Sequence, residues 1–451
     1  MATLLETYKN RINVAEQVYA KSNNGAKMDN NRKVMIATVL NNTNKFLSEA
    51  FENSVGTQRS DLGLWKKFAL NLTNVALPNL IAPELVITHP MTSMSGYVVY
   101  CKYTAGTKKG ETERGKLLND PFKLGDVDVN YTAARVVETD ELQEDEESGD
   151  VFVKLAWFPV YNGEDEASHI QFLDPTTNEP IVGIVIDEEN SDFETGKIVL
   201  AEGGAAGDEI KVKYVYDNIR IPQNDLPIVN VSMESIPLIA KARRIAVYYS
   251  QMAAFQAKTD YGFDMAEQLA EKAVGELVYE IDTEITDLLA ETAGAVDADL
   301  TWSKTLPVGV SKAEHYEGFT EILEIARQKI YDATKRFAPN YMLCSSSLLP
   351  VLTFIKGFTA APAGAINGPY FAGTLNGLKV FVTPNIDQGT FCVGVNGSDM
   401  ASSVAVYAPY MAVVPTQLLQ YADGGTSQGW STLYDLKVLN PNLIVKGKIV
   451  A

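Results

Sequence analysis

Cysteine, histidine and long apolar runs are scarce in this sequence, and each scarcity excludes a class of protein. The 451 residues contain three cysteines, Cys101, Cys344 and Cys392, and three histidines. Cysteines so few and so widely spaced exclude a disulfide framework or a cysteine-rich zinc site, and they fit a reducing compartment. No run approaches the roughly 20 apolar residues of a membrane-spanning helix. Residues 1–21 also lack the apolar stretch of a signal peptide, so we expect a soluble protein that stays where it is made.

Positive charge is in deficit as well. The chain has 38 Lys and Arg against 57 Asp and Glu, which gives a formal net charge of -19. A surface with this balance is poorly suited to clamping nucleic acid, because it lacks the excess of cations that neutralises phosphates. Hydrophobic residues at 46% and charged residues at 21% are typical of an ordinary folded protein. The length allows two or three domains.

The motifs of catalysis are missing too. There is no Gly-x-Ser-x-Gly elbow, no Walker phosphate loop and no His-Glu-x-x-His pair. Residues 203–207 are glycine-rich, but they join two predicted strands and are interpreted as a hairpin turn. Eight carboxylates crowd residues 138–150 without the acid spacing of an EF-hand, which favours a solvated acidic loop over a calcium site. We therefore predict a protein that is not an enzyme and has no catalytic residues, cofactor or metal.

Helical and strand patterns are both present and predict an α+β fold. Residues 1–75 indicate a helical, loosely attached arm, too poor in apolar residues to be stable alone. We expect it to pack on something else, such as a neighbouring subunit. Five short strands are predicted within residues 151–217, as in a small β domain. Its predicted core consists of Phe152, Trp157, Phe172, Ile184 and Val212.

The strongest periodicity predicts one helix over residues 264–292, about 43 Å long at 1.5 Å per residue. A second helix is predicted from Ser311, because Ser311 to Glu314 matches a capping box. Residues 241–244 form a tight basic cluster in a helical context. It suits an acidic neighbour or an internal nucleic acid, although a surface salt-bridge face is the simpler interpretation. Residues 341–451 alternate strands with Gly and Pro turns and end in a strand.

Three sets of residues, in this order, resemble segments of one known family. They are Leu77-Pro78-Asn79-Leu80-Ile81-Ala82 with His89-Pro90-Met91-Thr92, Ala240-Lys241-Ala242-Arg243-Arg244 with Gly262-Phe263-Asp264-Met265-Ala266, and Phe371 to Phe381 with Tyr407-Ala408-Pro409-Tyr410. With these segments the chain is similar to tailed-phage major capsid proteins of the Hong Kong 97-type fold, most of all to those of T-even-type phages. The likeness covers most of the chain outside residues 105–220.

The resemblance implies an order of domains. An N-terminal arm (1–75) precedes an E-loop region (76–235), which includes a β-rich insertion domain (105–220). A P-domain (236–340) follows, with a spine helix at 264–292, and then an A-domain (341–430) and a closing P-domain strand (431–451).

The resemblance also implies a structural function in the virion. Copies of the chain would form hexamers and pentamers of an icosahedral head that encloses double-stranded DNA without sequence-specific binding. Scaffold, portal and decoration or vertex proteins would be its partners, and assembly would take place in the host cytoplasm. Two alternatives stay open, an encapsulin-like compartment that holds an enzyme and a glycan-binding module formed by residues 130–220.

Two sets of site residues are predicted, a positive strip and a cleavage site. Lys102, Lys108, Lys109, Arg114 and Lys116 form a positive strip at the expected tip of the E-loop, and we predict that it meets carboxylates of an adjacent subunit. We also expect the insertion to project outward and to brace a neighbour.

Phe46-Leu47-Ser48-Glu49-Ala50 resembles the site at which T-even-type maturation proteases cut after a glutamate, which makes Glu49 a candidate cleavage site. Leu4-Leu5-Glu6 fits the same short motif. We expect Met1 to Glu49 to remain attached, helical, on the inner face of the shell and in contact with neighbouring subunits.

Overall fold

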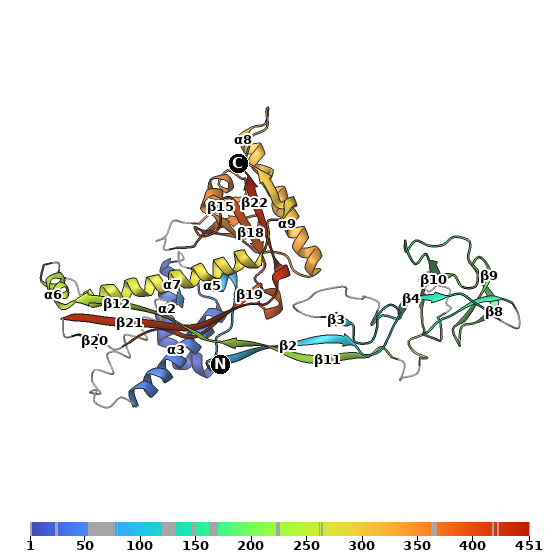
Figure 1. The fold of residues 1–451 in the computed structure, drawn as a ribbon, viewed down its shortest axis with the longest axis horizontal. Coiled ribbons are helices and arrows are strands. Elements are labelled where there is room, and N and C mark those ends of the chain that lie inside the picture. The colour runs from blue at the N-terminus through green and yellow to red at the C-terminus, as the bar shows by residue number, and fades with distance from the viewer. Residues whose placement is uncertain are drawn as a thin grey trace. The chain divides into compact units, whose positions relative to one another are not determined.

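Helices and sheets, most of whose strands run antiparallel, make up two compact units of the chain (Figure 1). The computed structural model describes residues 2–22, 26–52, 77–78, 80–119, 131–145, 149–161, 170–221, 226–260, 262, 265–361, 368–416, 419–421 and 424–450. Unit 1 comprises residues 1–98 and 235–451, and unit 2 comprises residues 99–234. The mixture of helices and sheets confirms the predicted α+β class.

A five-stranded sheet in unit 1 carries a helix on each face. Its strands are β1 (Ile87–Thr88), β19 (Ala405–Pro415), β21 (Gly425–Val438) and β12 (Lys241–Ser250) in spatial order, with β20 (Leu419–Gln420) beside β21. Trp430 packs on α7 (Met265–Thr292), whereas Leu433 packs on Leu47 of α3 (Asn30–Glu52). Because strand residues three apart point to opposite faces, α7 and α3 cover opposite sides of this sheet (Figure 1).

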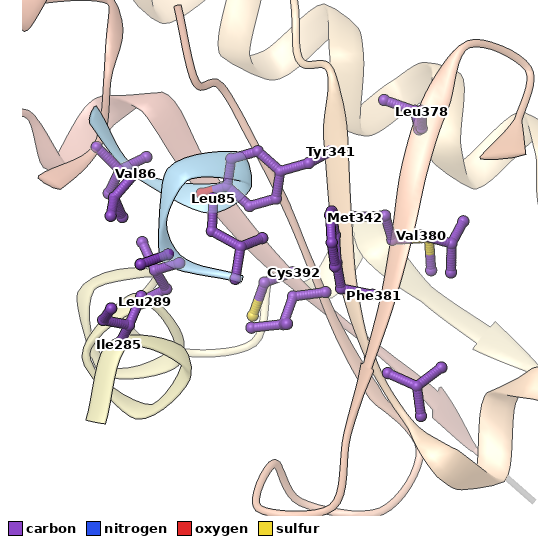
Figure 2. Packing of buried hydrophobic residues seen from close by; sticks show 14 of the residues in the cluster. Leu85, Val86, Ile285, Leu289, Tyr341, Met342, Leu378, Val380, Phe381 and Cys392 are labelled. Atoms are coloured by element: carbon purple, nitrogen blue, oxygen red, sulfur yellow. The ribbon is translucent and has the colours of Figure 1, made fainter. Parts of the chain in front are cut away.

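A seven-stranded sheet forms the other large layer of unit 1. Its spatial order is β13 (Thr301–Ser303), β22 (Ile444–Val450), β18 (Thr390–Gly394), β14 (Tyr341–Ser345), β17 (Leu378–Thr383), β16 (Tyr370–Leu375) and β15 (Phe358–Ala360). Every residue of β14 and β18 is buried, as expected for central strands that are covered on both faces. Figure 2 shows one side of this core, where Ile285 and Leu289 of α7 lie near Leu85 and Cys392.

The helices of this part follow the expected patterns with one interruption. The 264–292 periodicity is confirmed by α7, whose buried Ile281, Ile285 and Leu289 recur every four residues. The capping box is confirmed as well, because Ser311 and Glu314 exchange both hydrogen bonds at the start of α8 (Lys312–Glu317). Gly318 then separates α8 from α9 (Phe319–Thr334), which covers the seven-stranded sheet. Short helices are α5 (Ala82–Leu85), α6 (Gln251–Asp260) and α10 (Leu349–Leu352).

The N-terminal arm is an integral part of the core of unit 1. It consists of α1 (Ala2–Thr7), α2 (Lys9–Ser22) and α3, and its residues 53–75 lie outside the described residues. Met35, Ile36 and Leu40 of α3 are fully buried in the main core. The expectation of a loosely attached arm is therefore wrong for α3, since its apolar stripe packs on the sheet of its own chain.

Unit 2 contains a ribbon and a β-rich lobe. The ribbon is the sheet of β11 (Val229–Ile239), β2 (Ser95–Ala105) and β3 (Leu117–Asn119), part of which belongs to unit 1. The lobe has a sheet of β4 (Arg135–Glu141), β10 (Glu209–Val215) and β7 (Gln171–Leu173) and another of β5 (Gln143–Glu144), β6 (Val151–Lys154), β9 (Lys197–Glu202) and β8 (Val185–Asp192). Four of the five strands predicted within 151–217 are present as β6, β7, β9 and β10, whereas the strand predicted at residues 181–186 begins only at Val185, as β8.

The core of the lobe contains the residues predicted for it, apart from Phe152. Trp157, Phe172 and Val212 are buried in it, and Ile184 packs at its margin. Phe152 does not join this core, because its neighbour Val153 points inward and successive strand residues alternate faces. The glycine-rich 203–207 segment joins β9 to β10, which belong to different sheets, so it is not the turn of a hairpin.

The strand pairing contradicts two predictions, the helical context of residues 241–244 and the domain boundaries at residues 340 and 430. Lys241 to Arg244 are not helical but begin β12, which pairs along its length with β21. The final strand β22 pairs with β18 and β13 of the seven-stranded sheet, whereas β19 and β21 belong to the sheet beside α7. Each of these two sheets therefore combines strands that the predicted boundaries at residues 340 and 430 assign to different domains.

Candidate assembly surfaces

One face of the ribbon is apolar and exposed. Val231 and Met233 on β11 are 59% and 72% exposed, and Val99 and Tyr103 on β2 are exposed as well. The opposite face is polar, because Glu234 accepts a hydrogen bond from the hydroxyl of Tyr100 and forms an ion pair with Lys102. Since strand residues two apart share a face, the four apolar side chains lie together on the face away from Glu234. Large exposed apolar surfaces of this kind mark binding sites for other chains.

The predicted positive strip is divided by its contacts within the chain. Lys102 pairs with Glu234 at 2.7 Å and Lys108 with Glu113 at 2.8 Å. Arg114 and Lys116 are exposed. Exposed ion pairs contribute about 0–1 kcal/mol each, so such pairs can be exchanged for partners on another chain at little cost. The contact of these four residues with an adjacent subunit stays a prediction.

The prediction of an exposed positive strip is wrong for Lys109, because this residue is buried. Its side chain is 2% exposed, and its Nζ donates to the backbone oxygens of Tyr131, at 3.0 Å, and Ala133. The ammonium group also lies 5.0 Å from the ring centroid of Tyr216 and 5.6 Å from that of Trp157. Carbonyl oxygens and aromatic faces replace the water that a lysine loses on burial. Lys109 therefore fastens residues 106–112 to the lobe.

The acidic segment 138–150 is not a solvated loop throughout. Glu138 lies in β4 and is buried, and it accepts hydrogen bonds from the Tyr214 hydroxyl at 2.8 Å and the Ala156 amide at 3.0 Å. Burial raises the pKa of Glu138, while these two hydrogen bonds act in the opposite direction. Residues 146–148 of this segment lie outside the described residues. Glu138 therefore organises the lobe core and is not available to a calcium ion at the surface.

The candidate cleavage site lies at the C-terminal end of α3. Glu49 is exposed, but Leu47 is fully buried against Met411, Val414 and Leu433. Earlier in the same helix, the Asn42 side-chain amide donates to the backbone oxygens of Met91 and Tyr410. The bond after Glu49 is therefore part of a helix that packs on the sheet, which is not a conformation that a protease can bind.

Charged side chains also hold the segment that follows the arm. Arg32 of α3 is buried, donates to the Pro78 oxygen at 2.8 Å and pairs with Glu84 at 3.4 Å. The Asp282 carboxylate of α7 accepts a hydrogen bond from the Ile81 amide at 3.1 Å. Arg32 and Asp282 could not be predicted as buried contacts, since nothing in their local sequence patterns distinguishes them from surface charges.

The described residues offer little chemistry for catalysis. Among them, no three His, Cys, Asp or Glu side chains gather in a way that could hold a metal ion. Burial raises the pKa of Cys344 and of Cys392 to about 12, so both groups remain protonated thiols of low reactivity at neutral pH. No helix in the described parts is long and apolar enough to cross a membrane.

The exposed apolar face of the ribbon is typical of a subunit that binds other protein chains. The chain belongs to the family described as "Major capsid protein Gp23", whose model matches residues 62–448. It is therefore a major capsid protein of a tailed phage and forms the capsid shell of the virion.

Curated relatives are similar over most of the chain. The major capsid protein of Enterobacteria phage T6 is 23% identical over 412 residues, which is 82% of this chain and 77% of that protein. That of Escherichia phage AR1 is 22% identical over 403 residues, with 82% and 74% covered. Among solved structures, one from Mycobacterium phage Bobi is 11% identical with a TM-score of 0.35, covering 66% of this chain and 91% of that one.

Proposed function

We propose that copies of this chain form hexamers and pentamers, which close an icosahedral shell of the Hong Kong 97 type around the double-stranded DNA of the phage. The observation that carries this proposal is the apolar face of the ribbon, formed by Val99, Tyr103, Val231 and Met233. A surface of this kind marks a site at which another chain binds, and identical subunits that cover one another in rotation generate closed assemblies.

The architecture supports a division into the domains of such a shell protein. We assign α7 as the spine helix and the five-stranded sheet beside it as the P-domain, and the seven-stranded sheet with α8 and α9 as the A-domain. On this assignment the closing strand β22 belongs to the A-domain. The ribbon is the E-loop, and the lobe at residues 131–221 is the insertion domain.

Charge supports a shell that encloses DNA without holding it tightly. The net charge of -19 disfavours binding of phosphates over most of the surface. The acidic lobe suits an outward position, where it would brace a neighbouring subunit, and Lys102, Lys108, Arg114 and Lys116 would meet carboxylates of that subunit. Scaffold, portal and decoration or vertex proteins are the further partners that we propose.

The arm is proposed to stay attached as a helical segment on the inner face. Its support is the burial of Met35, Ile36 and Leu40, which cleavage after Glu49 would remove from the core. Intact-mass measurement of the shell protein from mature particles tests this retention, because a chain that begins at Ala50 would contradict it.

Substitutions on the two faces of β11 test the proposed function of the ribbon. Val231→Asp and Met233→Asp place a charge on the apolar face, and Ser232→Asp places the same charge on the polar face of the same strand. We expect the first two to lower the assembled fraction at least tenfold and Ser232→Asp to have little effect, because a buried charge at an interface costs several kcal/mol. Sedimentation gives the fraction, and electron microscopy separates large DNA-filled shells from small protein-filled cages. Equal assembly of all three variants would contradict the proposal.

A further inference from the structure

The exposed side of α2, in the N-terminal arm, carries a row of hydrogen-bond donors. The opposite side of this helix packs on the main core of unit 1 through Tyr8, Ile12, Ala15 and Tyr19. Every fourth residue on the exposed side is polar, in the order Lys9, Asn13, Gln17 and Lys21, and these four are named the α2 row. At 1.5 Å per residue they follow one another at steps of about 6 Å, over about 18 Å of helix. Asn10 and Val14 are exposed beside them.

The α2 row is a positive surface in an acidic protein. Residues 7–28 contain four Lys and Arg against one carboxylate, a net charge of +3, whereas the rest of the chain contains 34 against 56, a net charge of -22. The one carboxylate is Glu16, and it pairs with Lys33 of α3 at 2.9 Å. Its charge is therefore compensated within the arm, and the local sign of charge favours an anionic partner.

The chemistry of the row fits a regular series of phosphates. Lys, Asn and Gln side chains are among the groups that donate hydrogen bonds to phosphate oxygens in complexes of proteins with DNA. Two lysines at the ends and two amides between them place a donor at each step along the helix. A partner protein would be met by a different composition, because lysine is depleted at protein interfaces and aromatic residues are enriched there.

We infer that the α2 row contacts the phosphate backbone of the DNA inside the shell. This inference rests on the proposed function, since it requires that the arm stays attached on the inner face of a DNA-filled particle. The two lysines of each copy neutralise about two phosphates, and the amides donate to neighbouring phosphate oxygens without reading base edges. The contact is therefore independent of sequence, and many copies share it over the inner surface.

Acetylation of lysines in DNA-filled particles, and in the same particles after ejection of their DNA, tests this contact. Lys9 and Lys21 should be acetylated about fivefold more slowly in the filled particles, because a phosphate about 4 Å away favours the protonated, unreactive ammonium by about this factor even in water. Lys304, an exposed lysine between β13 and α8, is the control and should react equally in both. Mass spectrometry of the peptides gives each extent of acetylation.

The outcomes separate this contact from the proposed function. Equally fast acetylation of Lys9 and Lys21 in filled and emptied particles would overturn the inference. Equally slow acetylation would also overturn it, since another protein chain would then cover the row. If the particles contain no peptide from residues before Ala50, the proposed retention of the arm is refuted, and the inference is refuted with it.

Two substitutions that keep the shape of the row test the role of its charge. Asn13→Asp with Gln17→Glu places two carboxylates against phosphates, and DNA released in a fixed time on heating should rise about fivefold or more. The control is Asn385→Asp with Gln388→Glu, which makes the same change at exposed amides between β17 and β18 and should release DNA as the wild type does. Both variants should assemble shells normally. Wild-type release from the row variant, or a loss of shell assembly in it, would contradict the inference.

Discussion

At the scale of single residues, a buried carboxylate makes the stability of unit 1 depend on pH. Burial raises the pKa of Asp282 to about 7, while hydrogen bonds from the Ile81 and Ala82 amides and the charge of Arg32 act in the opposite direction. In the unfolded chain an aspartate titrates near a pKa of about 3.9. The folded subunit therefore binds this proton more tightly. The protonated Asp282 side chain therefore stabilises the folded subunit fully below about pH 4, and this contribution is lost as the pH rises to about 7.

We predict that Asp282→Asn removes this dependence, because asparagine keeps an oxygen for the Ile81 amide and cannot ionise. Between about pH 5 and pH 8, the variant should gain stability relative to the wild type by roughly 3 kcal/mol, since about two pKa units of the shift lie in this range and one unit corresponds to ~1.4 kcal/mol. Thermal melting of the unassembled subunit measures the difference. Glu280→Gln, at an exposed position on the same helix, should follow the wild type. A difference that is constant with pH would count against this assignment.

The sequence could not predict which single charged residues are buried. Lys109 lies in a segment rich in Gly, Lys, Thr and Glu, which favours an exposed turn. It is buried because Tyr131, Trp157 and Tyr216, distant in sequence, surround its ammonium group. Glu138 differs in the same way from its acidic neighbours. Local composition reports the average environment of a segment, whereas burial of one side chain depends on which other segments pack around it.

At the scale of elements, α3 decides whether the bond after Glu49 is accessible. A protease binds its substrate in an extended form, so cutting here requires the last turn of α3 to unfold first. Leu47 opposes that unfolding by its burial against Met411 and Val414. Phe46 precedes it in the same turn but is exposed.

We predict that Leu47→Ala raises the rate at which a glutamate-specific protease cuts after Glu49 in the unassembled subunit. Removing a buried leucine side chain costs about 2–5 kcal/mol, and cutting follows the open population, so the rate should increase about tenfold or more. Phe46→Ala is the matched control and should leave the rate near that of the wild type. Mass spectrometry of chains that begin at Ala50 gives the rates. If both variants are cut equally fast, Leu47 does not hold this end of the helix.

Elements with strong periodicity could be predicted, and elements that depend on distant pairing could not. The apolar spacing of α7 and the short strands β6, β7, β9 and β10 could be predicted because each pattern is local. Lys241 to Arg244 contain good helix formers, but ten residues of β12 pair with β21 nearly 190 residues away, and that pairing overrides local propensity. The alternation of Val229, Val231 and Met233 is equally local, yet alternation alone does not tell a core face from an exposed face that awaits a partner.

At the scale of the whole molecule, nearly all of the net negative charge belongs to unit 2. Residues 99–234 contain 12 Lys and Arg against 29 Asp and Glu, a net charge of -17, and the remaining residues contain 26 against 28, a net charge of -2. In a shell, copies of unit 2 are held at high local concentration, so their charges repel one another. That repulsion opposes assembly, and salt weakens it because the screening length falls from about 30 Å at 0.01 M to about 8 Å at 0.15 M.

The lobe can be removed at a point where its two ends meet. The Gly106 amide donates to the Ile228 oxygen at 2.6 Å, so residues 107–227 can be replaced by Asn-Gly, which closes a tight hairpin between β2 and β11. We predict that this variant keeps the folded core of unit 1, so the circular dichroism signal of its helices should be unchanged. We also predict that it assembles less well, because the lobe no longer braces a neighbour. Its assembly should also be nearly independent of salt between about 0.05 M and about 0.3 M, whereas assembly of the wild type should improve over that range as the lobes are screened. Sedimentation across a salt series distinguishes the two effects. An equal salt dependence for both proteins would mean that the charge of the lobe plays no part in assembly, whatever its effect on the yield.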